Sequence, residues 1–188
     1  MPVLPIRIMG DPVLHAPAEP VTEITDEIRQ LVTDMYDTMD AAPGVGLAAP
    51  QVGVGLRIYV YTYQDDDGQA WRGEIINPEL WMRPLEPGSP DPDDESEGCL
   101  SFPGERFPLR RSDEVLVTGT DLTGSPVEIR VDGWRARIMQ HEFDHLDGIL
   151  YIDRLDDSDW KTTQKIAKKR GWGRPGLAWM PGVDDLDA

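Results

Sequence analysis

The hydrophobic residues near the N-terminus follow helical spacing. Between positions 22 and 41 they recur three or four residues apart, at Ile24, Ile28, Leu31, Val32, Met35 and Met39. This spacing places apolar side chains on one face of an amphipathic helix. Thr22 or Thr25 can cap its start, and Pro43 with Gly44 ends it. We therefore predict a helix over residues 22–41 that packs one side against the core.

Four short stretches are rich in β-branched and aromatic residues, a composition that favours strands. They span residues 57–62, 74–77, 114–121 and 127–131. The last two are separated by five residues that include glycine and proline, as is typical of a hairpin turn. We predict antiparallel strands in this part of the chain.

Two further helices are predicted in the C-terminal part. Residues 133–146 form the first, with Gly148 as its C-terminal cap. The second spans about 158–170 and turns three residues inward: Trp160, Ile166 and Ala167. Residues 171–188 are rich in glycine and proline and end acidic. The element order predicts an α+β fold, with antiparallel β-strands packed around a buried central helix and with N-terminal and C-terminal helices.

The length and composition narrow the classes of protein that the chain can be. Its 188 residues fit one domain. No apolar stretch approaches the ~18 residues that span a bilayer, and the N-terminus resembles neither a signal nor a transit peptide, so we expect no membrane contact. A single cysteine excludes an internal disulfide, which indicates the cytoplasm. A net charge of −17 opposes nucleic-acid binding by the body of the protein.

The segment 84–97 is acidic and proline-rich. It contains six acidic residues and no lysine or arginine. We interpret it as a solvated loop beside the active-site cleft, with the acids serving solubility. Glu97 at its end is an exception, because we expect it to pair with Arg106, Arg110 or Arg111 and to support the site.

The chemistry of the chain is concentrated in H-E-F-D-H at 141–145. In the predicted helix, His141 and His145 lie one turn apart, about 5–6 Å from each other, and can bind one metal ion. Glu142 lies about 100° around the helix, near the ion without being a ligand. It is placed to take a proton from the attacking water. A solvated helix face carrying two histidines is the alternative interpretation.

A catalytic metal site of this type needs a third protein ligand. Metallopeptidases of one H-E-x-x-H class place a histidine six residues after the second one, and that position is Tyr151 here. An acidic ligand, Asp153 or Asp156, remains open by spacing alone. Cys99 is the more attractive candidate, because a thiolate is a strong ligand for a borderline metal.

Three motifs give the chain a resemblance to the peptide deformylases. They stand in the family's order: G-V-G-L-A-A-P-Q at 44–51, E-G-C-L-S at 97–101 and Q-H-E-F-D-H-L-D-G at 140–148. The resemblance covers residues 1–155 and fades in the tail. It implies one catalytic domain over residues 1–188, with a deformylase-like core followed by a helix and tail at 156–188.

The resemblance also implies roles for individual residues. In the family the cysteine and both histidines bind the metal and the glutamate is the acid/base, which correspond to Cys99, His141, His145 and Glu142. No catalytic position is replaced. His15 stands where the family often has arginine, and we interpret it as structural or at the surface.

Four more residues contact the substrate if the resemblance holds. Gln51 and the backbone N–H of Leu100 form an oxyanion hole, and Gly44 and Gly46 let the substrate backbone approach closely. The implied reaction hydrolyses the N-formyl group of newly synthesised polypeptides and releases formate. The natural ion of the family is Fe(II), and zinc, nickel or cobalt can occupy the site.

Three interpretations compete at this stage. The first is a deformylase acting on N-formylated nascent polypeptides. The second is an H-E-x-x-H metallopeptidase with an acidic third ligand. The third is a non-catalytic, metal-stabilised module that docks on the ribosome. Six basic residues cluster in the C-terminal helix and tail: Lys161, Lys165, Lys168, Lys169, Arg170 and Arg174. We interpret them as a solvated helix face, and the alternative is ribosome contact, which the resemblance implies from the role of the C-terminal helix in related deformylases.

Overall fold

The computed structural model describes residues 2–64, 68–85 and 87–184. Within them, the main sheet is antiparallel and has the strand order β2-β3-β4-β7-β8. Its strands are β2 (Gly46–Ala48), β3 (Ile58–Gln64), β4 (Ala70–Met82), β7 (Glu114–Thr120) and β8 (Pro126–Asp132). The four stretches predicted as strands all lie in this sheet. The predicted hairpin turn joins β7 to β8.

Two smaller sheets complete the strands. One is the hairpin of β5 (Ser96–Cys99) and β6 (Phe102–Pro108), and the other pairs β1 (Ile6–Arg7) with β9 (Ala178–Trp179), near the two ends of the chain. Composition did not predict them, because Ser-Glu-Gly-Cys lacks the residues that favour strands.

The helices lie close to where periodicity predicted them. They are α1 (Asp26–Ala41), α2 (Gly133–Leu146) and α3 (Asp157–Arg170), with short 3-10 turns η1 (Pro12–His15), η2 (Ala49–Val52) and η3 (Tyr151–Arg154). The first two end at the expected positions, because α1 ends before Pro43 and α2 ends at Leu146. The cap of α2 is Asp147 and not the predicted Gly148. Gly148 follows with φ +73°, and a Cβ there would lie 2.8 Å from backbone atoms of Ala16, so only glycine fits.

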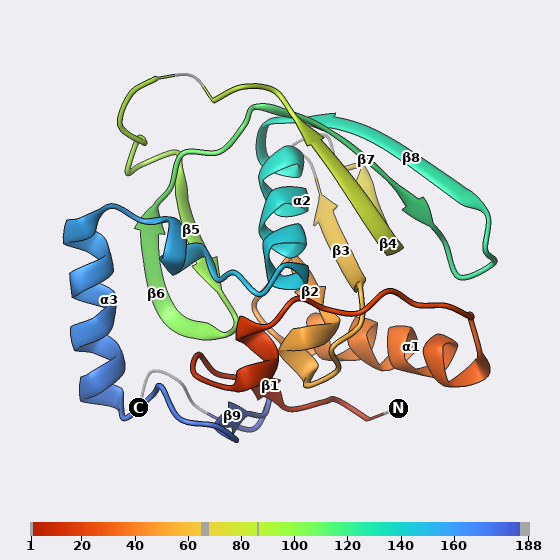
Figure 1. Ribbon diagram of the computed structural model, residues 1–188, viewed down its shortest axis with the longest axis horizontal. Coiled ribbons are helices and arrows are strands. Elements are labelled where there is room, and N and C mark those ends of the chain that lie inside the picture. The colour runs from red at the N-terminus through yellow and green to blue at the C-terminus, as the bar shows by residue number, and fades with distance from the viewer. Residues whose placement is uncertain (1, 65–67, 86, 185–188) are drawn as a thin grey trace.

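Helix α2 is covered on two sides. Ala136, Met139 and Leu146 are buried against the main sheet with Tyr59 and Val117. On the side away from that sheet lies the β5–β6 hairpin, with α3 beyond it (Figure 1). A helix in this position can present polar side chains between the two layers without exposing them to bulk water. The result is a mixed fold of helices and antiparallel sheets.

The third predicted helix requires a correction. Trp160 was expected to face inward, but it is 44% exposed. Ala167 is buried and Ile166 is partly buried, as expected. Thr163 takes the inward position one turn after Trp160, because its methyl group is buried while its hydroxyl donates to the Trp160 carbonyl.

The acidic segment before β5 is solvated only in part. Asp91, Asp93 and Asp94 are exposed as predicted, and Glu86 lies outside the described residues. Glu95 was wrongly assigned to solubility, because Arg110 and Arg137 bind its carboxylate. Glu97 is bound by arginines, as expected. In the described parts of the chain, no helix is long and apolar enough to cross a membrane.

Candidate metal centre

Three predicted ligands converge between α2 and the end of β5. The ligand atoms of Cys99, His141 and His145 all lie within 4.8 Å of one another. Cys99 Sγ is 3.4 Å from His145 Nε2, and the two imidazole centroids are 5.0 Å apart. The backbone register of the hairpin shifts between Gly98 and Cys99, which ends β5 with the sulfur at the helix.

This donor set fits one transition-metal ion. One thiolate and two imidazoles suit a borderline metal, and three protein ligands leave a coordination position for a reactant. The acidic alternatives are engaged elsewhere: Asp153 accepts the Leu150 N–H at 2.9 Å, and Asp156 caps α3. His15 is exposed and accepts the Gly10 N–H, in agreement with a structural role.

Glu142 lies on α2 between the two histidines in sequence and is only 4% exposed. Its Oε2 has no hydrogen-bond partner among the described residues. Burial raises the pKa of this carboxyl to about 7, while the neighbouring His141 acts in the opposite direction. A carboxyl with these properties is suited to exchanging a proton near neutral pH.

Gln51 faces the sulfur from the 3-10 turn η2. The Ala48 N–H donates to its Oε1 at 2.8 Å, which fixes the orientation of the amide and turns Nε2 toward the site. Nε2 lies 3.8 Å from Cys99 Sγ and 3.3 Å from Ser101 Oγ. An N–H donor is therefore held beside the cluster. Sequence reasoning missed Ser101.

The glycines of the 44–51 motif leave room for the functional side chains. A Cβ on Gly46 would lie 2.1 Å from Glu142 Oε1, and one on Gly44 would lie 2.9 Å from Leu100 Cδ1. A side chain at Gly46 would displace the glutamate. The structure thus adds a reason for glycine that is separate from the substrate contact expected from the resemblance.

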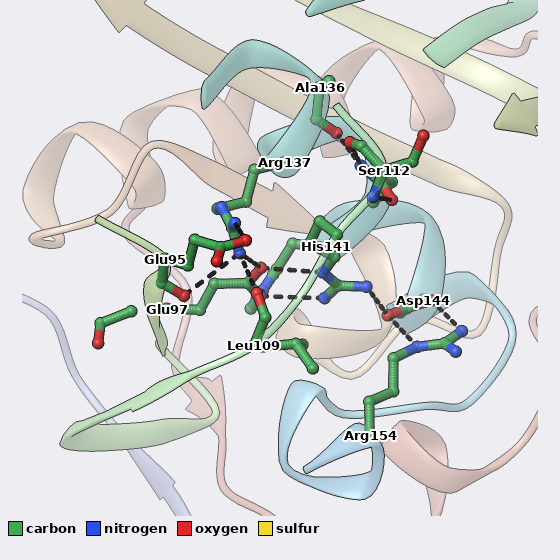
Figure 2. Close-up of polar contacts among 12 residues, drawn as sticks. Glu95, Glu97, Leu109, Ser112, Ala136, Arg137, His141, Asp144 and Arg154 are labelled. Carbon is green, nitrogen blue, oxygen red and sulfur yellow. Dashed lines mark hydrogen bonds and ion pairs between the residues drawn. The ribbon is translucent and has the colours of Figure 1, made fainter. Parts of the chain in front are cut away.

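A buried network of charges surrounds His141 (Figure 2). Glu97 Oε2 is 3.0 Å from His141 Nδ1, and its carboxylate also accepts from Arg111 at 2.9 and 3.0 Å and from Arg137 at 2.8 Å. Burial opposes ionisation, but hydrogen bonds from His141 and Arg111 hold the pKa of Glu97 well below its usual range. The carboxylate stays charged and orients the imidazole.

The network continues to the end of the helix. Asp144 accepts from Arg111 at 2.6 Å and from Nε and Nη2 of Arg154, each at 2.6 Å (Figure 2). The predicted partner Arg111 of Glu97 is correct. Arg110 instead pairs with Glu95, and Arg106 donates to the Ser96 carbonyl. Arg137 was missed, although it precedes His141 by one helical turn.

The cluster opens on a cavity of about 540 Å³. Gln51, Cys99, His141 and Glu142 contribute its polar wall. The remaining wall includes seven apolar residues: Pro43, Val45, Leu100, Pro103, Trp134, Ile138 and Trp179. A pocket with one apolar side and a few convergent polar groups suits a ligand that carries a hydrophobic side chain next to a reacting polar group.

Comparison with known proteins decides the family. The profile described as Polypeptide deformylase matches residues 3–161. The chain is 52% identical to the peptide deformylase of Rhodococcus opacus (strain B4) over 187 residues, which covers 97% of this chain and 95% of that one. The chain belongs to the polypeptide deformylase family. It is thus a metal-dependent hydrolase.

Other deformylases are similar to this chain in sequence and in structure. The peptide deformylase of Mycolicibacterium smegmatis (strain ATCC 700084 / mc(2)155) is 50% identical and aligns with 97% of this chain and 96% of its own. The structure of a deformylase from Legionella pneumophila has a TM-score of 0.76 at 35% identity, covering 90% of this chain and 96% of that one. The structure of a deformylase from Synechococcus elongatus in complex with actinonin has a TM-score of 0.77 at 35% identity. The match covers 93% of this chain and 92% of that one.

One earlier interpretation changes with this assignment. The metallopeptidase alternative is set aside, because the deformylase likeness extends over nearly the whole chain. The family profile ends at residue 161, close to where the resemblance was expected to fade, while individual deformylase sequences align with 97% of the chain.

Proposed function

We propose that this enzyme removes the N-terminal formyl group of newly made polypeptides by hydrolysis at an ion held by Cys99, His141 and His145. The observation that carries the proposal is the convergence of three ligand atoms beside a buried, unpartnered carboxylate at the wall of one cavity. Helix α2 is then the central element of the active site, because it supplies two ligands and Glu142.

The proposed ion is one divalent metal, natively Fe(II), with zinc, nickel or cobalt as substitutes. The Cys/His/His donor set is compatible with all four. When bound, the ion supplies Lewis-acid chemistry that polarises a carbonyl and makes water more acidic. Glu97 keeps His141 oriented for binding through its contact with Nδ1 at 3.0 Å.

Glu142 acts as the general base and then as the general acid. It accepts the proton that water loses on attacking the formyl carbon, and it delivers that proton to the departing amine. The C–N bond breaks, and formate and a free amino terminus are released. Its burial and its Oε2, which has no hydrogen-bond partner among the described residues, support this role.

Gln51 and Leu100 stabilise the negative charge that develops on the formyl oxygen. The Gln51 Nε2 is fixed by the contact of its own Oε1 with Ala48, so the donor needs no reorientation during the reaction. The Leu100 N–H follows the cysteine directly in sequence and comes from the same cavity wall. Removing a donor of this kind typically costs ~10²–10³ in rate.

The formylated polypeptide lies along the glycine segment. Gly44 and Gly46 line the cavity and permit close approach of the substrate backbone. The methionine side chain enters the apolar part of the cavity near Leu100, Trp134 and Ile138.

One experiment tests the activity directly. Protein purified without oxygen should release formate from formyl-Met-Ala-Ser and leave acetyl-Met-Ala-Ser intact. The acetyl peptide differs by one methyl group at the carbonyl and controls for general peptidase activity. Cleavage of an internal peptide bond, or equal rates on both peptides, would contradict the proposal.

We further propose that the chain acts as one catalytic domain over residues 1–188 and works in the cytoplasm, close to the ribosome. The basic cluster on α3 and the tail is exposed, in contrast to the acidic body of the protein: Lys161, Lys165, Lys168, Lys169, Arg170 and Arg174. Reversing the charge of the four lysines should abolish co-sedimentation with ribosomes at low salt while formate release persists. Unchanged co-sedimentation would remove the ribosome from the proposal.

A further inference from the structure

The C-terminal tail returns to the active site through Trp179. This residue lies in β9, which pairs with β1, and its side chain is only 5% exposed. Its indole Nε1 donates to the backbone carbonyl of Leu100 at 2.8 Å, and its ring lines the catalytic cavity. A residue near the end of the chain therefore contacts the segment that follows Cys99.

The peptide unit that Trp179 holds also contacts the sulfur. The Leu100 carbonyl and the Ser101 N–H belong to the same planar peptide bond. That N–H lies 3.4 Å from Cys99 Sγ. Trp179 thus hydrogen-bonds one end of the peptide unit whose other end donates to the sulfur. Hydrogen bonds at the two ends of one amide polarise each other, so the first strengthens the second.

The N-terminal segment holds the neighbouring peptide unit. Met9 N–H donates to the Ser101 carbonyl at 2.9 Å, and its own carbonyl accepts from Gly173 in the tail at 3.1 Å. The Ile8 N–H donates a hydrogen bond to the Leu177 carbonyl at 3.0 Å. In Figure 1, β1 and β9 lie together below the β5–β6 hairpin. Both ends of the chain therefore hydrogen-bond to the backbone of the segment that follows Cys99.

We propose that Trp179 is a positioning residue that sets the electron donation of the Cys99 thiolate and the direction of the Leu100 N–H. The inference rests on the proposed roles of Cys99 and Leu100. Without the indole N–H, the 100–101 peptide can rotate, the sulfur loses part of its hydrogen bond, and the sulfur becomes a stronger donor to the ion. The adjacent Leu100 N–H also turns away from the substrate oxygen.

The test compares Trp179→Phe with Trp172→Phe, using protein loaded with Co(II). Trp172 is a matched control from the same tail, whose ring packs edge-on against Phe102 at 5.1 Å and is not part of the cavity wall. We expect Trp179→Phe to move the sulfur-to-cobalt charge-transfer band to longer wavelength. It should lower kcat about tenfold with little change in KM. Trp172→Phe should keep the band position and kcat of the wild type.

A second variant controls for the possibility that Trp179→Phe impairs folding. Site-specific replacement of Trp179 by 3-benzothienylalanine keeps the bicyclic shape but has sulfur in place of the N–H. It should keep the thermal unfolding midpoint and reproduce the band shift of the phenylalanine variant. An unshifted band in this variant, or a raised KM with normal kcat, would overturn the inference and make Trp179 only a wall of the cavity.

The wild-type spectrum separates this inference from the proposed function. Absence of a sulfur-to-cobalt band in wild-type protein would show that Cys99 is not a ligand, and both proposals would then fail. A band present in the wild type and unchanged in both Trp179 variants would leave the metal site intact and remove only the role of Trp179.

Discussion

Two buried glutamates lie beside the proposed metal ligands, and their surroundings differ completely. Glu97 and Glu142 are both 4% exposed. The Glu97 carboxylate accepts from His141, Arg111 and Arg137, whereas Glu142 Oε2 has no partner among the described residues. The pKa of Glu97 therefore lies well below its usual range, while burial raises that of Glu142 to about 7.

The difference shows how the fold assigns roles to identical side chains. A carboxylate surrounded by cations stays ionised and serves as a fixed orienting group. A carboxylate buried without compensation holds its proton more tightly and can exchange it during a reaction. Because the two side chains are chemically identical, their surroundings set the difference between the roles. The predictions below test this comparison, beginning with the largest expected effect.

The first prediction concerns Cys99, the proposed thiolate ligand of the ion that both glutamates serve. Cys99→Ala should lose most of its bound metal, and formate release should fall to background, because two imidazoles alone bind an ion weakly. Metal content after gel filtration and formate release, measured beside the wild type, check this. Full occupancy with a normal rate would place the third ligand elsewhere.

The second prediction concerns the proton-exchanging glutamate. Glu142→Gln should retain the metal but lower kcat by ~10²–10⁴, because an amide of the same shape cannot accept a proton. Its thermal unfolding midpoint should not fall, since the substitution removes a buried charge that has no compensating partner. Near-normal turnover in metal-loaded protein would end the assignment of Glu142 as the base.

The third prediction applies the same chemical change to the orienting glutamate. Glu97→Gln should weaken metal binding about 10–100-fold, because His141 loses its anionic partner. It should also lower the free energy of unfolding by about 3 kcal/mol, because Arg111 and Arg137 lose their shared buried counter-charge and keep only Asp144 and Glu95. Competition with a chelator and denaturant melts provide the two measurements. If both substitutions changed the free energy of unfolding equally, the proposed difference between the surroundings of the two glutamates would be contradicted.

The fourth prediction probes the outer end of the network. Arg154→Gln removes a half-exposed arginine from Asp144 and leaves Arg111 in place. The expected loss of unfolding free energy is about 1 kcal/mol or less, with metal affinity unchanged. A tenfold loss of metal affinity in this variant would show that orientation of His141 depends on the whole chain of charges and not on Glu97 alone.

The sequence supported many of these structural conclusions in advance. Helical periodicity located α1 and α2 within a few residues, because their apolar residues face a core. Turn residues located the β7–β8 connection. The H-E-x-x-H spacing predicted two histidine ligands, and the resemblance implied Cys99 as the third. The structure brings these three side chains together.

Other features depend on contacts between distant segments. Local composition does not encode the pairing of β5 with β6, the burial of Thr163 in place of Trp160, or the return of Trp179 to Leu100. Arg137 and Asp144 had no local signal either, because their partners lie on other elements.

The two glutamates show the same limit most clearly. The sequence predicted different roles for Glu97 and Glu142, but it did not show how strongly either carboxyl holds its proton. Only the tertiary structure brings two arginines and the His141 imidazole to the first, while Oε2 of the second has no hydrogen-bond partner among the described residues. The residue type determines that a proton can be bound. Burial and through-space charge, which act between segments far apart in the chain, determine how strongly it is held.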